Sequence, residues 1–91
     1  MDETTFRARL AELGAAEPYT VDWAPGHASP EHTHDFTAFG LVLAGAFTLE
    51  LPDGPCRVPA GQTFELKAGV PHREVVGTEG ARVLAGRIFA R

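Results

Sequence analysis

The stretch from residue 32 to residue 45 reads HTHDFTAFGLVLAG and joins two histidines to a long apolar run. His32 and His34 are two residues apart, so their side chains share one face of an extended chain. The Phe, Leu, Val and Thr residues that follow favour a β-strand, which we predict over residues 33–45. The histidine pair is either part of a metal site or a polar pair at the mouth of a loop.

Glycine and proline divide the rest of the chain at short intervals. Ten glycines and seven prolines occur in 91 residues, and between them lie short runs rich in Val, Leu, Phe and Thr. Many short strands between turn signals are typical of a sandwich or barrel. We therefore expect about eight strands, with turns at residues 43–45 and 78–81, a hairpin tip at Asp53-Gly54 and a last strand over 81–90.

The N-terminal segment follows a different, helical pattern. Its apolar residues recur at i, i+4 and i+7, on one face of a helix, at Phe6, Leu10 and Leu13. We predict a helix near residues 3–13, capped by Asp2 or Thr4 and ended by Gly14. Its apolar face is expected to pack on the sheet or on a partner chain.

The length of 91 residues suits one domain. We expect residues 1–15 to form a helix that braces a barrel made by residues 16–91. A domain of this size buries only about 60–65% of its unfolded surface, so a homodimer is expected. The net charge is -4 and no basic run occurs, which argues against nucleic acid as a direct partner.

Cys56 is the one cysteine, so no internal disulfide is possible. We expect Cys56 to serve as a small structural residue in or near a strand. The longest apolar stretch, residues 38–47, is about half of the ~18 residues that span a bilayer. The first ten residues contain no apolar signal-peptide core. A cytoplasmic protein without a membrane partner is therefore expected.

The chain has four histidines, at positions 27, 32, 34 and 72. Neutral imidazole is the commonest metal ligand in proteins. A pair such as His32 and His34, joined by a third histidine from a distant strand, can form a three-point face around a divalent ion. Such a face leaves coordination positions open, as metal catalysis requires.

The spacing around these histidines resembles the two motifs of the cupin superfamily. Residues 26–45 are similar to the first motif, G-x5-H-x-H-x3-E-x6-G, and residues 61–72 to the second, G-x5-P-x-G-x2-H-x3-N. The matching residues are Gly26, His32, His34 and Gly45 in the first motif, and Gly61, Gly69 and His72 in the second. Together the motifs cover about a third of the chain.

The resemblance implies an all-β fold: a small antiparallel β-barrel of the cupin type, a jelly-roll-like double-stranded β-helix, here with a short N-terminal helix. It also implies a divalent transition metal (Fe, Mn, Zn, Ni or Cu) held by His32, His34 and His72. The chain departs from the motifs at three positions, with Ala38 for the glutamate, Lys67 for the proline and Val76 for the asparagine. Only the first departure removes a metal ligand.

Glu74 is a candidate for the missing carboxylate. If His72 points into the barrel, Glu74 points the same way on a regular strand, and a charge inside a small barrel is costly unless it is paired or bound to metal. We therefore expect Glu74 to act as a compensating ligand or as a catalytic acid or base. The alternative is an outward Glu74 paired with Arg73 or Arg82.

Other residues near the motifs have structural interpretations. We expect His27 to be a solvated loop residue, with a role as an extra ligand as the alternative. Asp35 and Glu31 are expected to face outward by side-chain parity. The aromatic and aliphatic residues expected in the core, with cavity lining or the pocket mouth as the alternative, are Trp23, Phe36, Phe64 and Leu66.

Three functions are consistent with this pattern, because one fold hosts many chemistries. The first is a metal-dependent enzyme acting on a small molecule: a dioxygenase, an isomerase or a lyase. The second is a non-catalytic module that senses a ligand or zinc and works with a regulatory partner. The third is a barrel without metal, whose histidines are satisfied by one another and by water.

Overall fold

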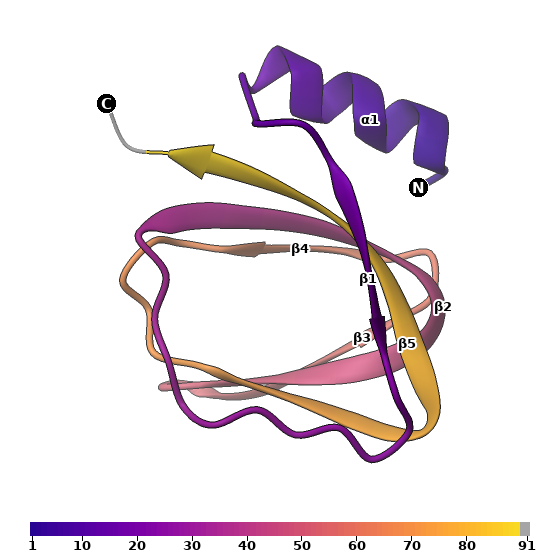
Figure 1. Ribbon diagram of the computed structural model, residues 1–91, viewed down its shortest axis with the longest axis vertical. Helices are drawn as coiled ribbons and strands as arrows, with labels where there is room; N and C mark the ends of the chain where they lie inside the picture. Colours follow the sequence, from indigo (N-terminus) through magenta and orange to yellow (C-terminus); the bar gives the residue numbers. More distant parts are fainter. Residues whose placement is uncertain (90–91) are drawn as a thin grey trace.

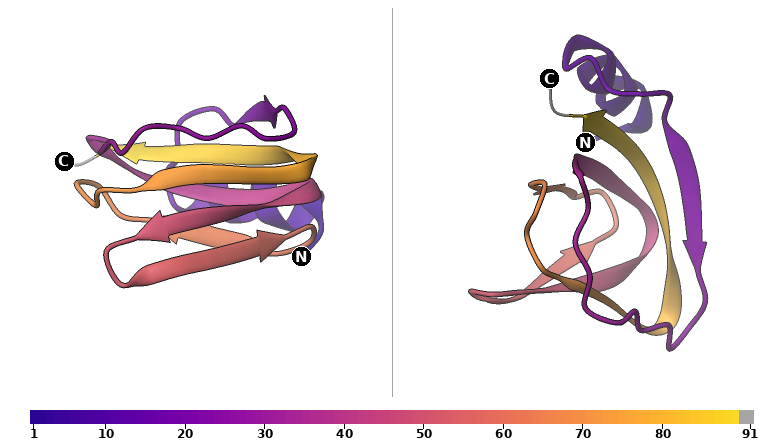
Figure 2. Two further views of the ribbon diagram at one scale, coloured as in Figure 1. Left: turned by 90° about the horizontal axis from the view of Figure 1, so that it is seen from below. Right: turned by 60° about the vertical axis from the view of Figure 1, so that its left-hand side comes forward.

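Two long strands form most of the sheet in the computed structural model, which describes residues 1–89 (Figure 1). Strand β2 (Phe36–Leu51) and strand β5 (Arg73–Phe89) pair antiparallel along nearly their whole lengths. Three shorter strands complete the fold: β1 (Tyr19–Trp23), β3 (Gly54–Pro59) and β4 (Thr63–Leu66). The sheet order is β1-β5-β2-β3, with β4 on β2, and Figure 2 shows the sheet curled into an open barrel. The predicted all-β barrel class is confirmed.

The prediction of about eight strands was wrong, because the expected turns at 43–45 and 78–81 are bends within β2 and β5. The register shifts between Val42 and Ala44 and again between Gly45 and Phe47. Gly45 and Gly80 have positive φ angles of 71° and 70°, and a Cβ on Gly45 would collide with the carbonyl oxygen of Gly80. Glycine therefore lets both strands turn a barrel corner without ending.

The bends also decide which side chains face the barrel interior. Because the register shifts, the inward residues of β2 have even numbers before the bend and odd numbers after it. Near the bend, the interior is packed with buried apolar side chains: Val42, Phe47, Leu49, Val58, Val76, Ala81 and Val83. Trp23 packs against this cluster. The interior core is thus filled at one end of the barrel.

Helix α1 (Glu3–Glu12) lies on the outer face of the sheet of its own chain (Figure 2). The Asp2 carboxylate accepts a hydrogen bond from the Thr5 backbone N–H at 2.7 Å, so Asp2 is the N-cap. Phe6 and Leu10 are 2% and 1% exposed. Both lie in a second apolar cluster with Leu41 and Leu84 from the outward faces of β2 and β5.

The remaining differences from the predictions are small. The helix ends one residue before the expected boundary, and the hairpin turns at residues 52–53 instead of 53–54. Cys56 lies in β3 and is exposed. The last residue of the strand predicted over 81–90 lies outside the described residues. Among residues 1–89, no helix has the length and apolar content needed to cross a membrane.

Candidate metal centre

The segment between β1 and β2 carries His32 and His34 across the barrel, along the lower and left-hand edge in Figure 1. The backbone N–H groups of His32 and His72 each donate to the other's carbonyl oxygen at 3.0 Å. Gly69 donates to the carbonyl of His34 at 2.9 Å. The predicted strand from residue 33 begins only at Phe36, because the preceding residues bond to the 69–72 segment instead of to a neighbouring long strand.

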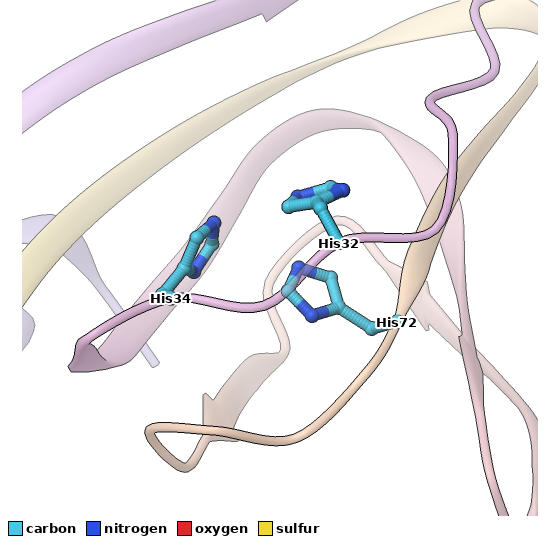
Figure 3. A group of neighbouring side chains, drawn as sticks. All are labelled: His32, His34 and His72. Atoms are coloured by element: carbon cyan, nitrogen blue, oxygen red, sulfur yellow. The ribbon is translucent and has the colours of Figure 1, made fainter.

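These backbone contacts bring the three predicted histidines together. One nitrogen from each of His32, His34 and His72 lies within 4.8 Å of the others. The ring centroids of His32 and His72 are 4.2 Å apart, and those of His34 and His72 are 4.8 Å apart. Figure 3 shows the three rings turned toward one another, His32 and His34 from the crossing segment and His72 from the loop that leads into β5. Three imidazoles this close can share one ion.

Two of the rings are held in a defined tautomer. His32 Nδ1 lies 2.8 Å from the carbonyl oxygen of Pro30, and His72 Nδ1 lies 2.9 Å from that of Val70. A carbonyl oxygen only accepts, so in the neutral rings each Nδ1 carries the hydrogen and each Nε2 keeps its lone pair. Hydrogen bonds of this kind orient the histidine ligands of metal sites.

The polar atoms of the group are incompletely satisfied. His72 is 1% exposed, and its Nε2 and the Nδ1 of His34 find no hydrogen-bond partner within residues 1–89. Burial lowers the pKa of His34, and the nearby His72 and His32 lower it further, so this ring is in its neutral, metal-binding form at neutral pH. Because unpaired buried polar atoms are costly, the residues fit a bound cation.

The carboxylate of Glu74 also turns toward the group. Its Oε2 lies 3.4 Å from His32 Nε2 and 3.8 Å from His72 Nε2, and the side chain is 13% exposed. The Ser29 hydroxyl donates to the same oxygen at 2.7 Å and accepts from the Glu74 backbone N–H at 2.9 Å. Sequence reasoning missed Ser29, since nothing local marks a contact across 45 residues.

The other charged or polar residues near the motifs lie outside the group. Asp35 and Glu31 are exposed, as their parity predicted. His27 lies in a loop, as predicted, but it is only partly solvated, because its ring is half-buried and stacks on Trp23 with centroids 5.8 Å apart and planes 6° apart. The three-histidine group of the described structure does not include it.

A cavity of about 70 Å³ opens beside the histidines. Its wall is mainly apolar: Tyr19, Val21, Trp23, Phe36, Ala38, Phe47, Leu49, Phe64, Leu66, Val83 and Ala85, with His34, His72 and Glu74 as the polar members. Phe36, Phe64, Leu66 and Trp23 therefore line the cavity as well as contributing to packing. Phe36 stacks on His34 with centroids 4.5 Å apart. The composition of this wall, apolar with a few convergent polar groups, is like that of small-molecule sites, while the volume is below their usual range of about 300–1,000 Å³.

Several solved structures are similar to the chain. A conserved protein of unknown function from Streptococcus pyogenes, SPY1581, superposes with a TM-score of 0.73 and 22% identity over 81% of this chain and 64% of that chain. The polyketide cyclase RemF from Streptomyces resistomycificus superposes with a TM-score of 0.66 and 28% identity over 81% of this chain and 53% of that chain. For the DMSP lyase DddQ from Ruegeria pomeroyi, the TM-score is 0.72 and the identity 22%, over 78% of this chain and 36% of that chain. The chain thus spans less than two thirds of each of these proteins.

The fold and the histidine group together define a small β-barrel protein with a potential metal centre. The sequence profile described as the cupin domain matches residues 19–88. The chain therefore belongs to the cupin family. No curated protein matches its sequence significantly.

Proposed function

We propose that the chain is a metalloprotein in which His32, His34 and His72 hold a divalent transition metal. The supporting observation is the convergence of one nitrogen from each ring within 4.8 Å. In addition, two ring nitrogens of the group are buried without a hydrogen-bond partner among the described residues. Nitrogen ligands of this type suit zinc, iron, nickel or copper, and manganese is also used in mixed sites. A metal held here supplies Lewis-acid or redox chemistry at the cavity.

We further propose that Glu74 provides the carboxylate that Ala38 lacks. Its Oε2 faces the two Nε2 atoms of His32 and His72, and the Ser29 hydroxyl fixes that oxygen. Ser29 is itself held in place, because its backbone N–H donates to the Glu74 carbonyl at 3.0 Å. Glu74 can then serve as a fourth ligand, or accept and return a proton at Oε2.

The cavity supports a small-molecule substrate. Its wall is mainly apolar, with Phe36 and Trp23 among the large side chains that line it. The similar structures include a lyase and a cyclase. We propose a dioxygenase, isomerase or lyase type of reaction, in which this chain's residues orient the substrate and Glu74 moves the proton.

A sensing module is the second candidate. Three histidines and one carboxylate supply four ligands, which is the number that closes a tetrahedral zinc site. The position of Glu74 Oε2 beside two of the imidazoles favours this alternative. In that case the protein reports zinc or a cavity ligand to a partner and catalyses nothing.

Metal titration of the protein tests the role of Glu74. Glu74→Gln keeps the size of the side chain and the hydrogen bond from Ser29 but removes the charge. We expect the zinc affinity to fall at least about tenfold, the usual minimum for loss of an important ligand-sphere group. Glu79→Gln is the matched control, since Glu79 is an exposed carboxylate on the same strand. Equal affinities in the two variants would exclude Glu74 as a ligand.

A further inference from the structure

Arg87 lies near the C-terminal end of β5, in the row of side chains that faces the barrel interior. Val83 and Ala85 line the cavity, and Arg87 is the next residue of the same parity on the strand. On the neighbouring strand β2 its register partner is Ala38, which also lines the cavity. Arg87 therefore projects on the cavity side of the sheet, whereas Leu84 packs beneath the helix on the opposite side.

Aromatic rings surround the guanidinium group of Arg87. Its Cζ lies 4.9 Å from the ring centroid of Tyr19, 5.6 Å from that of Phe36 and 5.9 Å from that of Phe89. Cation–π contacts of this kind hold the guanidinium in place. Phe36 in turn stacks on His34, so a single aromatic ring links the cation to the metal centre.

The hydrogen-bonding capacity of Arg87 is not used within residues 1–89. Its Nε is buried and has no acceptor there, and no carboxylate of the described chain forms an ion pair with it. The contrast with the other arginines of β5 is clear. Arg73 pairs with Glu50 at 3.2 Å and Arg82 with Asp22 at 2.7 Å.

A half-buried guanidinium with a free, fixed Nε is suited to a planar anion. Arginine binds carboxylates through two parallel N–H···O bonds, and its five donors match that geometry. Ala38, directly across the ladder, has no polar side-chain atom to serve as an acceptor. No acceptor for this N–H lies within the described chain. Three neighbours of Arg87, namely Tyr19, Phe36 and Ala38, line the cavity that also reaches His34 and His72.

We propose that Arg87 is the anion-binding residue of the cavity and that the ligand is a small carboxylate. One end of this molecule binds the Arg87 guanidinium, while its other polar end faces the histidine group. The proposal deepens the proposed function and rests on it for the role of the second end. Arg87 thus determines specificity by selecting anionic over neutral molecules of the same shape.

Succinate is the test ligand, and succinamide is its neutral isostere. The experiment follows the Arg87 Nε–Hε resonance of nitrogen-15-labelled protein, identified by its loss in Arg87→Gln, first without metal and then with zinc. We expect succinate to shift this resonance saturably, succinamide to leave it unmoved, and zinc to tighten succinate binding. Because Arg87→Gln lacks this resonance, the succinate affinity of each variant is measured by titration calorimetry. Arg87→Gln should weaken succinate binding at least about tenfold, because a charge-assisted hydrogen bond is lost.

Arg82→Gln is the matched control, since it removes the same charge from an exposed arginine of β5 that pairs with Asp22. It should change succinate affinity by less than about twofold, the scale of a screened surface charge. Arg87→Lys provides a second variant if Arg87→Gln fails to fold, and we expect weaker binding than in the unmodified protein because the lysine head lacks the planar fork.

The outcomes separate this inference from the proposed metal function. An unmoved Arg87 resonance, or equal succinate affinity in Arg87→Gln and Arg82→Gln, overturns the anion site even if zinc binds. A saturable shift without any zinc binding supports the anion site and removes the metal function. A saturable shift together with tightening by zinc supports both.

Discussion

The two faces of β2 and β5 use the same alternation of side chains but end in different environments. The outer face is covered by α1, and its cluster of Phe6, Leu10, Leu41 and Leu84 contains only apolar side chains, none more than 2% exposed. The inner face is equally apolar near the bend, yet at its open end it carries a cavity and buried ring nitrogens without partners among the described residues. The outer cluster and the packed part of the inner face both stabilise the fold, and the candidate site lies at the incompletely packed end of the inner face.

The largest expected effect comes from emptying the outer cluster. Leu84→Ala removes a fully buried side chain, and we expect a loss of about 3 kcal/mol in the free energy of unfolding. Zinc stoichiometry should be unchanged, because Leu84 faces away from the cavity. Urea denaturation measures the loss, and a value below about 1 kcal/mol would show that the helix is not tightly packed on the sheet.

Overfilling the same contact should cost less. An added Cβ at Gly86 would lie 2.7 Å from Leu10 Cδ2 and 2.9 Å from Cδ1. Gly86→Ala should therefore destabilise the fold by about 2 kcal/mol, the usual range for overpacking. In Leu10→Ala the methyl group would enter the space that leucine leaves, so the double variant should be more stable than the sum of the single changes implies. Simple additivity would contradict this packing.

A change at the open end of the inner face should affect stability mainly when metal is present. His72→Phe replaces the imidazole with a somewhat larger apolar ring and loses the hydrogen bond to the Val70 carbonyl, so the metal-free protein should lose about 1–2 kcal/mol. The unmodified protein should gain about 2.7 kcal/mol at a zinc concentration one hundred times its dissociation constant, and the variant should gain nothing. Thermal unfolding with and without zinc measures both. Equal stabilisation of the two proteins would show that zinc binds elsewhere.

The smallest expected effect is the pH dependence of the helix cap. The hydrogen bond from the Thr5 backbone N–H, together with its side-chain hydrogen bond, lowers the pKa of Asp2. Because the pKa is lower in the folded state, the stabilisation is complete above the unfolded pKa and is lost as pH falls through the folded pKa. Asp2→Asn keeps a capping oxygen but cannot titrate. The stability advantage of the unmodified protein over this variant should shrink between about pH 5 and pH 2; a constant difference would contradict the cap.

Local pattern was enough to predict the fold class and the main helix. The i, i+4 spacing of Phe6 and Leu10 predicted the buried helical face correctly. Short apolar runs between turn signals predicted a sandwich or barrel, and the resemblance to the cupin motifs implied the antiparallel barrel. The strand count was wrong because Gly45 and Gly80, which signal turns in the sequence, permit bends in continuous strands. A glycine with positive φ has the same local signature in both situations.

Spacing in the sequence identified part of the candidate site. Residues that join the site only through tertiary contacts were missed. The motif spacing selected the three histidines that the structure brings together, and parity placed Glu74 on their side. Ser29 and Arg87 gave no such signal, because their partners are far away in the sequence or absent from the described chain. Homodimer formation stays a prediction.

Metal content of untagged protein, measured by elemental analysis after zinc loading and dialysis, tests the central claim most directly. We predict about one zinc ion per chain, as expected for a single preformed site. His72→Phe should retain almost none, while His27→Phe, which alters a half-buried histidine outside the group, should retain it all. Equal zinc content in the two variants, or none in the unmodified protein, would contradict the claim that three imidazoles share one ion.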